Sequence, residues 1–291
     1  MMTSAAILRE RLAKGVCLAA PGVYDPFSAR LVERMGFDAV YLGGNAIGLH
    51  KAIGQPFVAL PETVAAVQDI RRVSSLPIIV DAGAGFGDAA HAALTMRTLV
   101  NAGAAALHID DQIYPKRAHY HRGRGRLAES PVVCGKLAAM AEAGEGSGAM
   151  LIARTDALRV SGSIEATIMR CRDYLAAGAT ALMVLDLGPD RMAPFRDAFP
   201  QTPFVWIVGM AAAVPTQSDL SAAGFAAAVY PFNTIGAVHE AIVRTWRDYA
   251  TTGRPAAFDR LAAAIVNDAL DAIGIEGALK IERKTTESEE A

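Results

Sequence analysis

The chain has 291 residues, 52% of them hydrophobic, and a formal net charge of −2. That length fits one large α/β domain or two small ones, and the near-neutral charge gives no electrostatic footprint for nucleic acid or an anionic membrane. Its three cysteines, Cys17, Cys134 and Cys171, have no metal-ligand spacing and suit a reducing cytosol. Residues 1–14 have no apolar core typical of a signal peptide, and no run approaches the roughly eighteen apolar residues of a membrane span. We therefore expect a cytoplasmic protein.

Short apolar segments recur along the chain, with helical segments between them. Most are continuous apolar runs, as expected for strands that are covered on both faces. We predict eight strands, at residues 16–20, 39–42, 78–80, 106–109, 150–153, 181–185, 204–208 and 226–230. Helices are predicted between them, for example at residues 26–35, 89–102, 131–143, 164–176 and 234–249. Several helical segments stop just before a glycine, which is the usual left-handed helix end.

Eight β/α units in a chain of this length predict a (β/α)8 TIM barrel over residues 1–253. An open, doubly wound sheet is the alternative, but no phosphate-binding glycine fingerprint follows the first strand. Residues 254–281 are predicted to be a helical extension of the same domain, and residues 282–291 a disordered tail. Apolar residues recur at helical spacing in the extension, which serves either as core cover or as a contact with a second subunit: Leu261, Ile265, Leu270 and Ile273.

Two of the predicted strands end in carboxylates. The strand at 78–80 leads into Asp81 and a glycine-rich turn, and the strand at 106–109 leads into Asp110 and Asp111. The carboxyl ends of barrel strands share one rim, which is where active sites lie. Carboxylates gathered there indicate a hard cation such as Mg²⁺, with Asp81 and Asp110 binding it directly or through its waters. The alternative is that these acids cap the helices that follow.

Other residues at the predicted strand ends suit a small anion. Arg154 follows the fifth strand and would clamp a carboxylate or phosphate, with an internal ion pair to Asp156 as the alternative. Gly43 and Gly44 would leave backbone N–H groups free to approach an oxyanion. Together with the neighbouring Tyr41, they form the predicted substrate-binding set.

A basic loop at residues 114–126 directly follows the acid pair. It holds five cationic side chains and two histidines, and its glycines would permit closure as a lid over an anion. Lys116, His119, Tyr120 and His121 are candidate proton carriers and form the predicted catalytic set. A solvated basic loop, or one that pairs across a subunit interface, is the alternative.

The chain resembles the isocitrate lyase/phosphoenolpyruvate mutase superfamily over about residues 8–250. The likeness rests on the segments PGVYD at 21–25, YLGG at 41–44, DAGAGFG at 81–87, IDDQIYPKR at 109–117, IARTDA at 152–157, AAGA at 176–179 and VYP at 229–231. It implies a (β/α)8 barrel whose last helix is swapped between subunits of a homodimer or homotetramer. It also implies Mg²⁺, with Mn²⁺ as a substitute, and a small 2-oxo or 2-hydroxy carboxylate that passes through an enolate-like intermediate. The 2-methylisocitrate lyase-like and carboxyvinyl-carboxyphosphonate phosphorylmutase-like branches are the ones indicated.

Several positions depart from the pattern of that superfamily. The cysteine that supplies a proton in the lyase branch is replaced by Ala118, and the second acid of the Asp-x-Asp motif by Gly83. The acid after the second strand corresponds to Phe57, a later glutamate to Leu185, and the glutamate of the fourth strand to the shorter Asp110. Fewer acids predict weaker metal binding, or a metal that depends more on the substrate for its ligands. The Asn-Ser pair of the phosphonate mutases is also missing from the loop.

Three functions remain open from the sequence. The leading hypothesis is a Mg²⁺-dependent lyase that cleaves a carbon–carbon bond, with His119, Tyr120 or His121 in place of the missing cysteine. The second is carbon–phosphorus chemistry, as a mutase or hydrolase acting on a phosphonate or a phosphoenolpyruvate-like acid. The third is a degenerate barrel that has lost turnover and acts as a binding protein.

Overall fold

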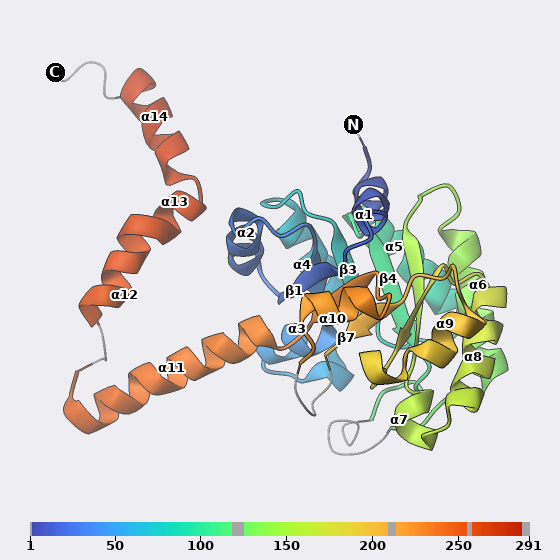
Figure 1. Ribbon diagram of the computed structural model, residues 1–291. Helices are drawn as coiled ribbons and strands as arrows, with labels where there is room; N and C mark the ends of the chain where they lie inside the picture. Colours follow the sequence, from blue (N-terminus) through green and yellow to red (C-terminus); the bar gives the residue numbers. More distant parts are fainter. Residues whose placement is uncertain (1, 118–124, 209–213, 255–257, 287–291) are drawn as a thin grey trace.

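The computed structural model describes residues 2–117, 125–208, 214–254 and 258–286, and its centre is a barrel of parallel strands (Figure 1). The strand order is β6-β5-β4-β3-β2-β1-β8-β7, and a parallel bridge between Leu182 and Phe204 brings the two ends together. The predicted (β/α)8 barrel is therefore confirmed. Its strands are β1 (Leu18–Val23), β2 (Val40–Leu42), β3 (Ile78–Asp81), β4 (Ala106–Asp110), β5 (Met150–Thr155), β6 (Ala181–Val184), β7 (Val205–Ile207) and β8 (Ala227–Tyr230).

Helices surround this barrel. Gly36, Gly103, Gly178 and Gly224 follow helices with φ angles of 82°, 111°, 103° and 87°, as the predicted helix stops require. The helices of the barrel are α1 (Ser4–Leu12), α2 (Pro26–Arg34), α3 (Gly44–His50), α4 (Leu60–Arg71), α5 (Ala89–Ala102), α6 (Ser130–Ala143), α7 (Ala157–Ser161), α8 (Ile164–Ala176), α9 (Ala193–Ala198) and α10 (Gln217–Ala222). Short 3₁₀ turns lie at η1 (Gln55–Phe57) and η3 (Pro189–Arg191).

Side chains alternate between the two faces of each strand, which separates the core into two layers. On β3, Ile78 and Val80 pack in the outer layer, under the helices, whereas Ile79 belongs to the cluster that fills the barrel interior. Leu8 of α1 joins this inner cluster and is 1% exposed, although α1 precedes the first strand. Because successive strand residues point to opposite faces, the same alternation decides which rim residues face inward.

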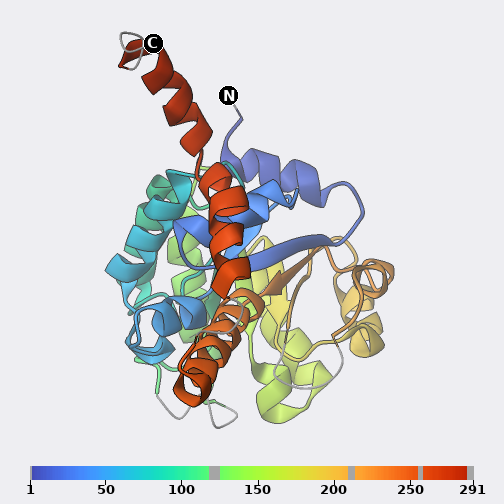
Figure 2. The same ribbon diagram turned by 90° about the vertical axis from the view of Figure 1, so that its left-hand side faces the viewer.

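The C-terminal helices extend away from the barrel (Figures 1 and 2). They are α11 (Asn233–Thr252), α12 (Phe258–Ala264), the π-helical turn η4 (Ile265–Ala269), α13 (Leu270–Ala272) and α14 (Ile275–Thr285). None of the residues of α11 is buried, so this helix does not cover its own barrel. The helices that extend from the barrel thus begin with α11 at Asn233, and α14 ends at Thr285. The domain boundaries at residues 253 and 281 stay predictions. Among the described helices, none has the length and hydropathy needed to cross a bilayer.

Candidate active site

Three charged side chains meet at the C-terminal end of the barrel. Asp81 ends β3, Asp110 ends β4, and Arg154 lies next to the last residue of β5. Strand register sets Asp110 beside Arg154, and Asp81 beside His108. All four side chains are buried. The structure therefore brings together the two acids and the arginine that the sequence placed at one rim.

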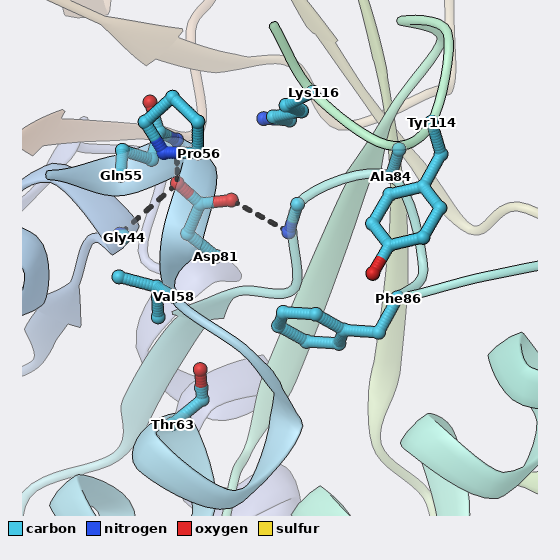
Figure 3. Close-up of a pocket in the computed structure, with 11 residues that line it drawn as sticks. Gly44, Gln55, Pro56, Val58, Thr63, Asp81, Ala84, Phe86, Tyr114 and Lys116 are labelled. Atoms are coloured by element: carbon cyan, nitrogen blue, oxygen red, sulfur yellow. Dashed lines mark hydrogen bonds between the residues drawn. The ribbon is translucent and has the colours of Figure 1, made fainter. Parts of the chain in front are cut away.

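Asp81 is held by hydrogen bonds on both of its carboxylate oxygens (Figure 3). Its Oδ2 accepts from the backbone N–H of Gly44 at 3.1 Å and from the Gln55 side-chain amide at 3.4 Å. Its Oδ1 accepts from the backbone N–H of Gly83 at 2.9 Å. The Gly44 amide, expected to be free for an oxyanion, is thus engaged by Asp81 in this structure.

The charges around Asp81 keep it ionised. Burial by itself would raise the pKa of this carboxyl, but His108 in its protonated form at low pH, Lys116, Arg154 and the Gly83 N–H outweigh burial and lower the pKa to about 2. A carboxyl with so low a pKa holds its negative charge throughout the physiological range. Asp81 is therefore suited to binding a cation or orienting a polar group, and not to donating a proton near neutral pH.

A small pocket opens beside Asp81. Its walls come from β3 and from the segments that follow β2, β3 and β4, and Figure 3 shows Pro56, Val58 and Phe86 beside the charged Asp81 and Lys116. Mostly apolar walls around a few polar groups are typical of small-molecule sites. The pocket therefore suits a small anion or polar molecule.

Gln55 is a site residue that the sequence reading missed. Its side chain is 6% exposed, and its Oε1 finds no hydrogen-bond partner among the described residues. The departures from the superfamily pattern drew attention to Phe57 as the replaced acid, but Phe57 is 69% exposed, whereas Gln55 reaches Asp81. A polar residue directly before the apolar run at residues 56–60 was the available signal. A buried, unpartnered carbonyl oxygen is costly unless a ligand or water satisfies it, so Gln55 is a candidate ligand-binding group.

Lys116 reaches into the same pocket from the basic loop. Its ammonium forms an ion pair with Asp110 Oδ2, and the two side chains are 6% and 0% exposed. The ends of the loop are joined by a short antiparallel bridge between Gln112 and Leu127, beside a hydrogen bond from Ile113 N to Arg126 O. Of the predicted catalytic set, Lys116 is thus placed at the site. His119, Tyr120 and His121 lie outside the described residues, as does Ala118.

Arg154 makes the internal ion pair that was the alternative to a substrate clamp. Its Nε and Nη2 donate to the two carboxylate oxygens of Asp156 at 3.0 and 3.3 Å. Gln112 also donates to Asp156 Oδ2, at 2.6 Å. The guanidinium is therefore fixed in orientation next to Asp110, and a substrate role for Arg154 stays a prediction.

Tyr41 lies inside the barrel, and its predicted role in substrate binding stays a prediction. Its ring is 1% exposed inside the barrel, and its hydroxyl is 2.9 Å from Nε2 of His108. His108 Nε2 is also 3.9 Å from Asp81 Oδ1, and burial lowers the pKa of His108 to about 4, so the imidazole is neutral at pH 7. Tyr41 and His108 therefore lie beneath Asp81 and support it. The sequence analysis did not predict His108 as a site residue. Its position on β4, two residues before Asp110, could have indicated it, because residues two apart on a strand point to the same face.

Asp111 points away from the pocket. Because it directly follows the inward-facing acid of β4, it faces the helices, where its carboxylate joins β5 to α8. It accepts from Thr155 Oγ1 at 2.6 Å, Asp156 N at 3.0 Å, Tyr174 OH at 3.0 Å and Arg170 Nη1 at 3.4 Å. Its role in the structure is to satisfy buried donors.

We expect Asp111→Ala to lower the free energy of unfolding by about 3 kcal/mol or more, because each buried donor left without an acceptor costs about 1–3 kcal/mol. Asp111→Asn keeps one acceptor oxygen and should cost less. Urea denaturation followed by circular dichroism measures both. Asp173→Ala is the control, since that acid is exposed on α8 and should change stability by less than about 0.5 kcal/mol. An unfolding free energy for Asp111→Ala equal to that of the control would contradict the structural role.

The acid that follows Leu185 has a separate partner. Asp186, next to Leu185, binds the guanidinium of Arg159 with two hydrogen bonds of 2.7 Å. Leu185 itself belongs to the cluster inside the barrel. Neither residue lines the pocket beside Asp81.

The donor set fits a metal that depends on its substrate. In the described part of the chain, no group of three or more His, Cys, Asp or Glu side chains is arranged to hold a metal ion. Mg²⁺, however, is commonly bound by one or two carboxylates, with water and substrate oxygens completing its octahedron. Asp81 and Asp110 supply two carboxylates, and Gln55, whose side-chain N–H donates to Asp81, adds an oxygen, Oε1, with no partner among the described residues. These residues therefore fit Mg²⁺ without forming a closed protein cage.

A (β/α)8 barrel with buried carboxylates, a lysine and an arginine at the C-terminal ends of its strands belongs to the class of TIM-barrel enzymes. The sequence model of the phosphoenolpyruvate phosphomutase family matches residues 8–250. The chain therefore belongs to this family, within the phosphoenolpyruvate mutase/isocitrate lyase superfamily. By this membership it is an enzyme of the lyase type found in the superfamily.

Individual relatives agree with this assignment. The chain is 31% identical over 250 residues to 2,3-dimethylmalate lyase of Eubacterium barkeri, covering 84% of this chain and 86% of that protein. It is 40% identical over 174 residues to 2-methylisocitrate lyase of Aeropyrum pernix, covering 60% of this chain but only 55% of that protein. A crystal structure of 2,3-dimethylmalate lyase superposes with a TM-score of 0.86 at 25% identity, covering 98% and 96% of the two chains.

Proposed function

We propose that the protein is a Mg²⁺-dependent lyase that cleaves a carbon–carbon bond of a small 2-hydroxy or 2-oxo carboxylate through an enolate-like intermediate. The observation that carries this proposal is the buried, ionised Asp81 beside Lys116 in a small pocket at the C-terminal end of the barrel. The names of the relatives, 2,3-dimethylmalate lyase and 2-methylisocitrate lyase, support a branched hydroxy acid as substrate.

In this proposal, the acidic residues of the site bind the cation and the basic residues bind the substrate. When bound, Mg²⁺ would stabilise negative charge on the oxygen of the developing enolate. Asp81 and Asp110 are the carboxylates that would hold the cation, and Lys116 supplies a second positive charge for the substrate. Arg154 would bind the substrate carboxylate, with its guanidinium oriented by Asp156.

Two features of the pocket would support the chemistry. The apolar side chains of Pro56, Val58 and Phe86 exclude water from one side, which strengthens the electrostatic interactions within. The backbone N–H of Gly44 is engaged by Asp81, so Lys116 replaces it in our proposal as the protein group that offsets the charge of the oxyanion. A histidine or tyrosine of the basic loop would return the proton that Ala118 cannot supply.

A second candidate is carbon–phosphorus bond chemistry on a phosphonate or a phosphoenolpyruvate-like acid. The family match to phosphoenolpyruvate phosphomutase favours it, and a lysine and an arginine near the pocket would bind a phosphonate as readily as a carboxylate. Both candidates need the same cationic site, so the two differ in the bond that is broken.

A substrate screen separates these functions. We would incubate the full chain and Mg²⁺ with C4–C7 hydroxy and oxo acids and with phosphonopyruvate, and measure released pyruvate and inorganic phosphate. Pyruvate or another 2-oxo acid from a hydroxy acid supports the carbon–carbon lyase, and phosphate from phosphonopyruvate supports the second candidate. No turnover, with no calorimetric binding of Mg²⁺ together with pyruvate or oxalate, would instead support a binding protein that lacks catalysis.

We expect His119→Ala or His121→Ala to lower kcat by about 10²–10⁴, because loss of a positioned proton carrier typically has this effect. A neutral imidazole near pH 7 is well matched to proton transfer, and the two histidines lie within three positions of Ala118. Steady-state kinetics on the identified substrate measure kcat and KM. Lys116→Ala should instead raise KM, because its ammonium would hold an anion. Near-wild-type kcat in both histidine variants would assign the proton to Tyr120 or a metal-bound water.

A further inference from the structure

Lys116 lies in space that a side chain at position 83 would approach. Gly83 has a φ of 56°, and a Cβ built on it would lie 3.8 Å from Cε of Lys116. The resemblance places the second acid of an Asp-x-Asp motif at this position. With glycine at position 83, the stem of Lys116 lies next to the backbone there and lines the pocket beside Asp81.

The ammonium of Lys116 acts on both candidate metal ligands. It pairs directly with Asp110 Oδ2, and its side chain lines the same pocket as Asp81. Asp81 is also engaged by three hydrogen-bond donors on its two oxygens. A lysine ammonium thus supplies the positive charge that these two carboxylates would otherwise share with a cation.

We propose that Lys116 is an internal competitor for the divalent cation, and that cation binding at Asp110 requires the ammonium of Lys116 to leave its ion pair. This inference rests on the proposed Mg²⁺ dependence and adds a coupling between the cation and the basic loop. Two positive charges beside the same buried carboxylate repel each other, so the site favours one of them at a time. The released lysine is then available to the anionic substrate.

The coupling has a consequence for the order of binding. Without substrate, the Lys116–Asp110 pair opposes the cation, and affinity for Mg²⁺ is weak. A substrate carboxylate gives the displaced ammonium a new partner. Mg²⁺ therefore binds more tightly to the protein–substrate complex than to the free protein, and substrate binds more tightly to the protein–Mg²⁺ complex. The same site therefore stays free of divalent cation until an anion is present.

Calorimetric titration of Mg²⁺ into Lys116→Met tests this directly, because methionine keeps the length of the stem and removes the charge. Without substrate, the variant should bind Mg²⁺ at least about tenfold more tightly than the wild type, as expected when a like charge next to a buried site is removed. Lys14→Met is the matched control, since Lys14 is exposed outside the pocket, and it should bind Mg²⁺ as the wild type does. Equal or weaker binding in Lys116→Met would overturn the competition.

A double mutant and a melting curve complete the test. In Asp110→Asn the tightening caused by Lys116→Met should disappear, because the two residues act on one cation site.

Lys116→Met leaves Asp110 buried without its ion-pair partner, so it should melt lower than the wild type without Mg²⁺ and gain more stability from Mg²⁺. A lower melting temperature with no greater gain from Mg²⁺ would also refute the competition.

The controls distinguish this inference from the proposed function. If the wild type binds Mg²⁺ in the presence of oxalate but Lys116→Met binds it no more tightly, the competition fails and the proposed Mg²⁺ dependence stands. If neither protein binds Mg²⁺ with or without oxalate, the Mg²⁺ dependence fails and the competition fails with it.

Discussion

Asp81→Ala should abolish Mg²⁺-dependent turnover, with a fall in kcat/KM of about 10³ or more, because a bound cation contributes several kcal/mol of charge stabilisation in the transition state. The carboxylate is buried, ionised and held by the Gly44 and Gly83 amides in one orientation. No other described carboxylate borders the pocket beside it. The reaction therefore loses one of the two carboxylates that we propose hold the cation.

The barrel should survive this substitution. Asp81→Ala leaves two backbone N–H groups without their acceptor, at a cost of about 1–3 kcal/mol each if no water replaces it, and the adjoining pocket is open to water. Circular dichroism and thermal melting measure the fold, and kcat/KM with and without EDTA measures the metal dependence. Asp69→Ala, at an exposed acid on α4, is the control and should retain activity. Unchanged activity in Asp81→Ala would remove the metal hypothesis.

The C-terminal helices should hold two or more copies of the chain together, and we propose a homodimer or homotetramer. On α11 the side chains of Val238, Ile242, Trp246 and Tyr249 are 38%, 54%, 59% and 48% exposed and recur at helical spacing. An apolar stripe of this size is rarely left in water, and the eighth helix of a barrel normally covers its own sheet. In its own chain, α11 leaves part of the barrel surface uncovered. We propose that α11 covers the same surface on the barrel of a second copy.

Light scattering should therefore give a dimer or tetramer for the full chain. Deletion of residues 254–291 should leave a monomeric or aggregating species, because it removes the helices beyond α11 and leaves the stripe exposed. Trp246→Glu should shift the assembly toward monomer by placing a charge in the apolar stripe. Thr251→Glu adds the same charge on another side of α11 and should leave the assembly unchanged. A monomeric full-length chain would contradict the swapped helix.

The sequence predicted the barrel because most strands are continuous apolar runs and several helices stop just before a glycine. The strand at residues 16–20 was the least accurate, since the structure has Leu18–Val23. Val16 is apolar but 57% exposed, whereas the strand continues through Pro21 and Gly22, two residues that disfavour strands. Burial on both faces of a barrel overrides such local preferences.

The site was predictable where strand alternation decides it. Asp81, Asp110 and Arg154 follow apolar strands and share an end of the barrel, so their rim could be read from sequence. The same alternation shows why Asp110 faces the pocket and Asp111 the helices, although adjacent acids look alike in a sequence. The histidines of the basic loop stay predictions, because they lie outside the described residues.

By itself, the sequence determined the (β/α)8 barrel, its family and the rim where its acids gather, because apolar runs, glycine stops and strand ends are local features of the chain. Only the tertiary structure decided the partners of those acids. Gln55 reaches Asp81 from a loop 26 residues earlier in the chain, and Lys116 reaches Asp110 past the space left at Gly83. The sequence also did not predict the direction of α11. An apolar stripe indicates that a helix packs against another surface, but it does not indicate which barrel provides that surface. Such contacts depend on how loops cross the end of the barrel, and no periodic pattern encodes that crossing.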